Sequence, residues 1–252
     1  MDGAKEQQFA IAKEMKDVRV AFDIMADDAV IPPAYQQMKC HIIFDVKMEN
    51  FRRKARLVAG GHMTETPASL TYSSVVSRYT VRIALTIAAL NGLNVQSSDI
   101  QNAYLTAPCK EKIWTILGTE WGVDVGRRAY IRRALYSLKA SGASFCNHLA
   151  NCMMNLGYKS CLADRDLWYK SQQHPGDGEP YYLYVLLYVD DCLCIHHDAK
   201  KEIHHLDKYF MMKKGSIGGP DIYLGARIRP QWLENGVYAW GMSSSKYFQE
   251  AI

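Results

Sequence analysis

Residues 181–195 read YYLYVLLYVDDCLCI and hold two adjacent aspartates, Asp190 and Asp191, inside an otherwise apolar run. Thirteen of these fifteen residues are apolar, so the flanks predict two buried strands that meet at the acidic pair. Burying an ionised carboxylate without a partner is costly, and neighbouring carboxylates repel each other. A hard divalent cation, which takes oxygen ligands, would neutralise the pair. The segment therefore predicts a metal-dependent chemical centre.

The length and composition favour an ordinary globular protein. The chain has 252 residues, of which 48% are hydrophobic, enough for one large domain or two small ones with a sizeable core. No run reaches the roughly 18 uncharged apolar residues of a membrane span, and the first residues lack a signal-peptide pattern. The seven cysteines form no CxxC pair. We therefore expect a reduced, intracellular protein without a membrane partner.

Basic residues gather in two blocks although the net charge is only +4. Residues 36–82 carry an excess of bases, and residues 125–163 carry six bases and no acid. Basic blocks on either side of a carboxylate centre suit a polyanion held over bound cations. Solvated surface charge explains each block equally well, so the sequence leaves both interpretations open.

The hydrophobic pattern alternates between helical and strand periods. Helical spacing predicts helices over residues 5–25, 78–90, 129–156 (broken near Ser141-Gly142) and 199–212. Runs rich in β-branched and aromatic residues predict strands over 38–47, 55–59, 95–100, 182–189, 192–195 and 221–228. A polar loop is expected over 171–180, and the order from residue 95 onward resembles the split βαβ pattern of ferredoxin-like sheets. In that arrangement Asp99 is the natural third acid beside Asp190 and Asp191.

Six motifs in order resemble one known family. Residues 188–191, YVDD, resemble the acidic box of reverse transcriptases, and residues 98–105, SDIQNAYL, resemble their first acidic motif. The other four resemble the copia-type (Pseudoviridae-like) retrotransposon polyprotein; they are 54–61 (KARLVAGG), 72–76 (YSSVV), 134–139 (ALYSLK) and 221–225 (DIYLG). The similarity extends from about residue 10 to the end of the chain.

This resemblance implies an α+β fold of the right-hand polymerase type, with fingers and palm. The palm would be a ferredoxin-like antiparallel sheet with helices on one face. The implied segments are an N-terminal helical part at 1–35, fingers at 36–92, the palm with the catalytic site at 93–230, and the start of a thumb or connection at 231–252. Together they would form one reverse transcriptase domain.

The implied activity is RNA-directed DNA synthesis, with nucleotides transferred from dNTPs to a primer 3′ end using two Mg²⁺ ions. By the same resemblance, Asp99, Asp190 and Asp191 are the catalytic and metal-binding acids, and the backbone carbonyl of Ile100 is a further ligand. Phosphoryl transfer depends on positioning and on neutralising negative charge, and two clamped cations supply the neutralisation.

The resemblance also implies the substrate-binding residues Lys54, Arg56, Tyr104 and Lys139. Arg56, together with Lys54, would hold the triphosphate, because a guanidinium matches phosphate geometry. Tyr104 would lie under the sugar and reject a 2′-hydroxyl by shape, and its alternative role is that of a core aromatic. The implied partners are an RNA/DNA template-primer, dNTPs and the remaining polyprotein domains, integrase and RNase H. The implied location is a cytoplasmic virus-like particle or the nucleus.

Three positions depart from the family pattern. Ser137 stands where a glycine is usual, Ala140 where a polar residue is expected near the nucleotide, and Phe145 where a tryptophan is common. Ser137 is expected to strain a backbone position suited to glycine. The alternative function is therefore a catalytically inactive retroelement remnant that at most binds nucleic acid. A metal-dependent nuclease or cyclase on a palm-like sheet is a third possibility, against which the KARLVAGG match argues.

Overall fold

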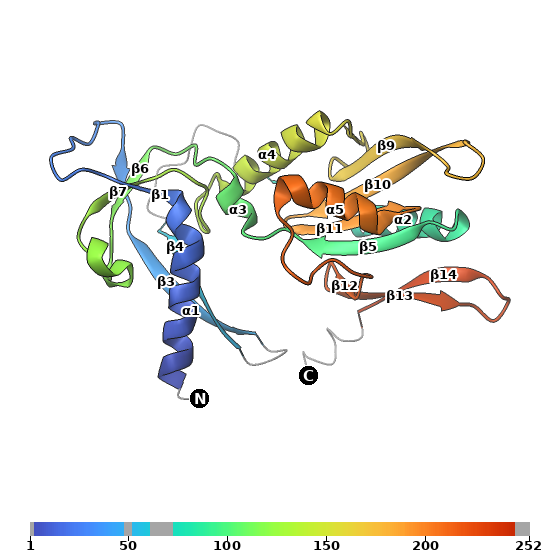
Figure 1. The fold of residues 1–252 in the computed structure, drawn as a ribbon, viewed down its shortest axis with the longest axis horizontal. Helices are drawn as coiled ribbons and strands as arrows, with labels where there is room; N and C mark the ends of the chain where they lie inside the picture. The colour runs from blue at the N-terminus through green and yellow to red at the C-terminus, as the bar shows by residue number, and fades with distance from the viewer. Residues whose placement is uncertain (1–2, 48–51, 61–72, 245–252) are drawn as a thin grey trace. The chain divides into compact units, whose positions relative to one another are not determined.

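The computed structural model describes residues 3–47, 52–60 and 73–244 (Figure 1). The chain divides into two compact units, one formed by Met1–Ser73 and Asn102–His148, the other by Ser74–Gln101 and Leu149–Ile252. Gly61 and Tyr72 of the family motifs, residues 48–51 and residues 245–252 lie outside the described residues.

The first unit combines short helices with two small sheets. Its helices are α1 (Gly3–Val18), η1 (Arg19–Ala21), α3 (Ala103–Thr106), η3 (Thr119–Asp124) and the start of α4 (Ser141–Asn155). Its strands are β1 (Phe22–Ile24), β2 (Gln36–Gln37), β3 (Cys40–Lys47), β4 (Arg52–Ala59), β6 (Ile113–Ile116) and β7 (Arg128–Ile131). One sheet has the order β1-β7-β6-β2, in which β2 and β6 are parallel, and β3 and β4 form an antiparallel hairpin.

One apolar cluster holds this unit together. Leu57 of β4, Ile113 of β6, Trp121 of η3 and the fully buried Leu135 pack into it. Helix α1 lies against β4, and the Glu14 carboxylate accepts a hydrogen bond from the Leu57 backbone N–H at 2.9 Å. The hairpin β3–β4 is thus fixed to a core that its own two strands could not build.

Two predicted helices in this unit are wrong in part. The helix expected over 5–25 ends at Val18, and residues 22–24 form β1 instead, paired with β7. The helix expected over 129–156 begins only at Ser141, because residues 128–131 form β7 between β1 and β6. Strand pairing, of β1 with β7 and of β7 also with β6, outweighs the weak helical preference of these short segments.

Arginines of the second basic block are largely occupied by partners in the same unit. Arg127 pairs with Asp124 at 3.1 Å, and Arg132 pairs with Asp23 at 3.2 Å and stacks over the Tyr130 ring at 4.5 Å. Hydrogen bonds from Arg19 and Arg127 hold the pKa of Asp124 below its usual value. These arginines therefore form ion pairs within the unit. This is a third explanation of the basic block, beside polyanion binding and solvated surface charge, and the sequence did not suggest it.

The second unit is built around one antiparallel sheet. Its helices are α2 (Arg78–Leu90), α5 (Ala199–Phe210) and the end of α4. Its strands are β5 (Asn94–Asp99), β8 (Lys159–Ser160), β9 (Leu167–Gln173), β10 (Pro180–Tyr188), β11 (Asp191–His196), β12 (Ile222–Tyr223), β13 (Ala226–Trp232) and β14 (Tyr238–Ser243). The main sheet has the order β5-β11-β10-β9-β8, and β12-β13-β14 form a separate sheet.

The interior strand β11, between β5 and β10, is buried on both faces. Leu193 and Ile195 pack into a cluster with α2, whereas α5 lies over β5 and β11, as Figure 1 also shows. Cys194, which points to the opposite face from its neighbours, is close enough to Glu202 of α5 for that carboxylate to help raise its pKa. Helices α2 and α5 therefore cover opposite faces, and the expectation of helices on one face is wrong.

The strand predictions for this unit need two corrections. Residues 171–173, expected in a polar loop, continue β9, which pairs with β10 along its whole length. The strand expected over 221–228 turns at Gly225 into β12 and β13, which pair with each other outside the main sheet. The mixed α/β character with antiparallel sheets is confirmed, while the ferredoxin-like strand order is not. The fingers and palm layout stays a prediction.

Replacing Ser137 by glycine is expected to stabilise the first unit. Ser137 has φ of 72°, in the left-handed region that its departure from the family glycine predicted. A non-glycine residue in that conformation is strained by roughly 1–2 kcal/mol. Glycine removes the strain, but it makes the unfolded chain more flexible, which lowers the free energy of unfolding by about 0.5–1 kcal/mol. We expect Ser137→Gly to raise the free energy of unfolding by about 0.5–1 kcal/mol in urea titrations. Ser144→Gly, inside α4, is the control and should lower the free energy of unfolding. If both variants lowered the free energy of unfolding equally, Ser137 would not be strained.

Candidate active site

The two central aspartates lie at a tight turn. Tyr188 of β10 pairs with Asp191 of β11, so Val189 and Asp190 form the two-residue connection. Val189 has φ of 54°, which is strained for a β-branched residue. Such strain persists only where the surroundings impose it, and it is common at functional sites. Here the paired strands impose it.

The neighbouring strand brings the third predicted acid to the same place. Asp99, the last residue of β5, is the direct cross-strand partner of Asp191. The backbone N–H of Ile100 donates to the backbone oxygen of Asp190 at 2.7 Å. Directly opposed residues in antiparallel strands share a face and lie about 4.5–5.5 Å apart at their Cβ atoms. Asp99, Ile100, Asp190 and Asp191 are thus gathered at one end of the main sheet.

The three carboxylates influence one another electrostatically. Burial raises the pKa of Asp191 to about 6, and the charges of Asp190 and Asp99 add to the effect. The positive charge of Lys213 lowers the pKa of Asp191. The Lys213 ammonium also forms an ion pair with Asp99. The Lys213 backbone N–H also donates to the Asp99 backbone oxygen at 2.8 Å. Sequence reasoning missed Lys213, since a lysine just after a predicted helix carries no signal of a long-range partner.

The donor set suits a hard divalent cation, because it consists of carboxylate oxygens that repel one another. A bound cation would relieve the unfavourable charge that the raised pKa of Asp191 records. Over residues 3–47, 52–60 and 73–244, no three His, Cys, Asp or Glu side chains are arranged to enclose a metal ion. The donor atoms of the three aspartates suit Mg²⁺, but their side chains are not arranged around one ion here. Their assignment as ligands stays a prediction.

The predicted substrate-binding residues all belong to the first unit. The guanidinium of Arg56, on β4, lies 5.7 Å from the ring centroid of Tyr136. The ring of Tyr104, in α3, meets the Tyr136 ring edge-on at 5.2 Å and the Phe145 ring at 5.9 Å. The buried Nε of Arg56 has no hydrogen-bond partner among the described residues. Arg56 and Tyr104 are thus joined through Tyr136, which the sequence did not single out.

The two predicted lysines occupy different parts of this unit. Lys54, on β4, stands across the hairpin from Asp45. It also lowers the pKa of Glu14, which burial raises overall. Lys139 lies half-buried in the segment before α4.

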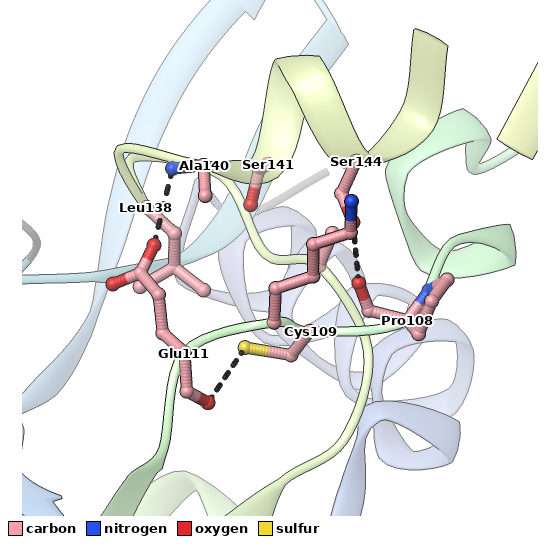
Figure 2. A pocket seen from close by; sticks show the side chains of 9 residues that line it. Pro108, Cys109, Glu111, Leu138, Ala140, Ser141 and Ser144 are labelled. Carbon is pink, nitrogen blue, oxygen red and sulfur yellow. Dashed lines mark hydrogen bonds between the residues drawn. The ribbon is translucent and has the colours of Figure 1, made fainter. Parts of the chain in front are cut away.

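Ala140 lines a small pocket of the first unit rather than an open surface (Figure 2). Its backbone N–H donates to the Glu111 carboxylate at 3.1 Å, and Cys109 donates to the Glu111 backbone oxygen at 3.4 Å. The pocket encloses about 140 Å³ including open solvent, below the roughly 300–1,000 Å³ of ligand pockets. It therefore fits no nucleotide, and Glu111 serves to hold the backbone that leads into α4.

Three neighbouring acids at one end of a sheet supply the oxygen donors that a hard divalent cation takes. The chain belongs to the reverse transcriptase (RNA-dependent DNA polymerase) family, whose model matches residues 30–238. This membership confirms the expectation drawn from the six motifs.

The curated relatives are plant transposon polyproteins. The chain is 27% identical to the retrovirus-related Pol polyprotein from transposon RE2 of Arabidopsis thaliana over 186 residues, 70% of this chain and 12% of that protein. It is 26% identical to the corresponding polyprotein from transposon TNT 1-94 of Nicotiana tabacum over 227 residues, 82% of this chain and 16% of that protein. The resemblance to copia-type elements is confirmed, and the chain spans less than a fifth of these relatives.

No helix in the described part of the chain is both long enough and apolar enough to cross a membrane.

Asp191→Asn is expected to stabilise the protein at high pH only. The folded pKa of about 6 exceeds the ordinary 3.8, so the folded state binds the proton more tightly and stability falls as pH rises between these values. A difference of that size corresponds to about 3 kcal/mol, which partial exposure reduces to about 1 kcal/mol. In urea titrations with EDTA, the free energy of unfolding of Asp191→Asn should exceed that of wild type by this amount at about pH 8 and differ little at about pH 4.

The control for this experiment is Asp28→Asn, at an exposed position of the first unit. It should leave stability unchanged at both pH values. A gain for Asp191→Asn of equal size at both pH values would contradict the proposed repulsion.

Proposed function

We propose that this chain catalyses RNA-directed DNA synthesis as part of a longer copia-type Pol polyprotein, by two-metal transfer of nucleotides from dNTPs to a primer 3′ end. The observation that carries the proposal is the cross-strand pairing of Asp99 with Asp191, beside Asp190 at the turn. Membership of the reverse transcriptase family supports the same reaction.

In this proposal Asp99, Asp190 and Asp191 hold two Mg²⁺ ions, with the Ile100 carbonyl as a further ligand. Bound there, the ions would neutralise charge on the attacking and leaving oxygens. Above a pKa of about 6, Asp191 is ionised and able to bind a cation. Lys213 restrains the Asp99 carboxylate through their ion pair. The backbone contacts between β5 and β11 keep the acids oriented before substrate arrives.

The first unit supplies the proposed substrate contacts. Arg56 would bind the triphosphate, since its buried Nε–H group is a hydrogen-bond donor without a partner among the described residues. Lys54 and Lys139 would add positive charge, and Tyr104 would limit the space beside the sugar. The further proposed partners are a template-primer and the integrase and RNase H domains of the polyprotein. The proposed location is a virus-like particle or the nucleus.

A catalytically inactive remnant is the second candidate. Two observations favour it: the left-handed Ser137, and the burial of Ala140 in a pocket too small for a nucleotide. Ser137 lies two residues before Lys139 and Ala140 directly after it, so an altered backbone there would weaken substrate binding. This candidate predicts a folded protein without nucleotide incorporation.

Primer extension on an RNA template with Mg²⁺ and dNTPs distinguishes the two candidates. Wild type should extend the primer, and Asp190→Asn should be slower by at least about a hundred-fold, because metal ligation supplies several kcal/mol of charge stabilisation. Glu234→Gln, at an exposed acid of the same unit outside the family motifs, is the matched control and should extend normally. Failure of wild type to extend, or equal extension by Asp190→Asn, would defeat the enzymatic proposal. Cleavage of labelled template without dNTPs would instead indicate a nuclease.

Magnesium binding can be measured apart from the reaction. A ligand that binds only the folded state raises the melting temperature. We expect MgCl₂ to raise the melting temperature of wild type at about pH 8, and to raise that of Asp190→Asn much less. An equal rise in both would argue against metal binding by the aspartates.

A further inference from the structure

Tyr136 lies between the two residues that the proposed function assigns to the nucleotide. The Arg56 guanidinium stacks over its ring at 5.7 Å, within the range of a cation–π interaction. The Tyr104 ring meets it edge-on at 5.2 Å, a favoured arrangement for aromatic pairs. One ring thus contacts both the arginine and the tyrosine.

The backbone on both sides of Tyr136 is held firmly. Its carbonyl accepts a hydrogen bond from Ala59 N–H at 3.1 Å, which ties it to the strand that carries Arg56. Before it, Leu135 is fully buried and its carbonyl accepts from the Ser141 hydroxyl at 2.6 Å. After it, Ser137 turns the chain in the left-handed conformation. The ring position therefore follows from three fixed neighbours rather than from its own packing alone.

Among the described residues, two carboxylates, those of Asp45 and Glu14, lie near the guanidinium of Arg56. Its ion pair with Asp45 is long, 3.8 Å, and the Asp45 side chain is 60% exposed, so the pair contributes little. Its Nε is buried without a hydrogen-bond partner among the described residues. The Tyr136 ring is the main rigid surface against which the guanidinium rests, and a planar cation stacks well on it.

We propose that Tyr136 is a positioning residue that sets the orientation of Arg56 toward the triphosphate and of Tyr104 toward the sugar. This inference rests on the proposed function, and it deepens that function by coupling triphosphate affinity to sugar selection through one ring. Tyr136 acts through its two neighbours and is assigned no contact with the substrate.

The test compares Tyr136→Leu with Tyr136→Phe, using the full chain in single-nucleotide primer extension. Leucine removes the ring, so KM for dNTP should rise at least about tenfold with a smaller change in kcat, and discrimination against rNTPs should fall. Phenylalanine keeps the ring and should stay within about twofold of wild type. Tyr130→Leu is the matched control, because it removes a stacking partner of Arg132 in the same unit and should leave KM and sugar discrimination unchanged.

A double-mutant comparison separates positioning from general loosening. In the Arg56→Ala background, Tyr136→Leu should raise KM little further, since the two residues act through one contact. Fully additive effects, or a fall in kcat alone with unchanged KM and sugar discrimination, would overturn the inference. Tyr136→Met, whose flexible side chain fills irregular space, replaces leucine if that variant does not melt cooperatively.

Binding of a fluorescent dNTP separates this inference from the proposed function. If wild type binds the triphosphate but extends no primer, the enzymatic proposal fails. The inference about Tyr136 then stands only if Tyr136→Leu weakens triphosphate binding at least about tenfold relative to Tyr130→Leu. If wild type binds no triphosphate, both fail.

Discussion

The antiparallel pairing of β5 with β11 is the constraint on which the candidate site depends. It sets Asp99 directly opposite Asp191 and joins Ile100 to the backbone of Asp190. Carboxylates at this spacing repel each other, so they stay together only because the surrounding sheet is stable. The fully buried residues Leu193 and Ile195, in the same strand, supply that stability through the cluster beneath α2. The apolar core thus offsets a local electrostatic cost.

Partners from outside the sheet reduce that cost further. Lys213 reaches Asp99 from the segment after α5, and it pairs with the same residue through side chain and backbone. This single residue links the end of a helix to the end of β5. The Lys213 charge also lowers the pKa of Asp191, which burial and the charges of Asp190 and Asp99 raise to about 6. Asp191 is therefore ionised at neutral pH.

Both clusters of functional interest contain a non-glycine residue in the left-handed region. Val189 lies at the acidic turn, and Ser137 follows Tyr136 in the first unit. In each case backbone hydrogen bonds or strand pairing on both sides impose the conformation. Strain of this kind persists only where the surroundings impose it, and here it lies next to Asp190 and Tyr136. The same physical device thus serves the carboxylates and the arginine–tyrosine cluster.

Much of the local structure could be predicted from residue pattern. Helix α2 has the bounds that its helical spacing predicted, and the strands flanking Asp190 and Asp191 are where the apolar runs placed them. The predictions failed where pairing decided the outcome. Residues 128–131 became a strand because β1 and β6 flank them, and residues 171–173 stayed in β9 because β10 runs alongside.

The sequence by itself determined the chemistry of this protein: two acids between apolar strands, a third acid at a strand end, and a set of motifs that assigns the family. The tertiary structure alone decided which distant side chains meet. It paired Lys213 with Asp99, placed Tyr136 between Arg56 and Tyr104, and gave Arg132 an internal partner. The reason is physical: periodicity records which face of one element is buried, whereas contacts between elements depend on strand register and on backbone turns that no local pattern encodes.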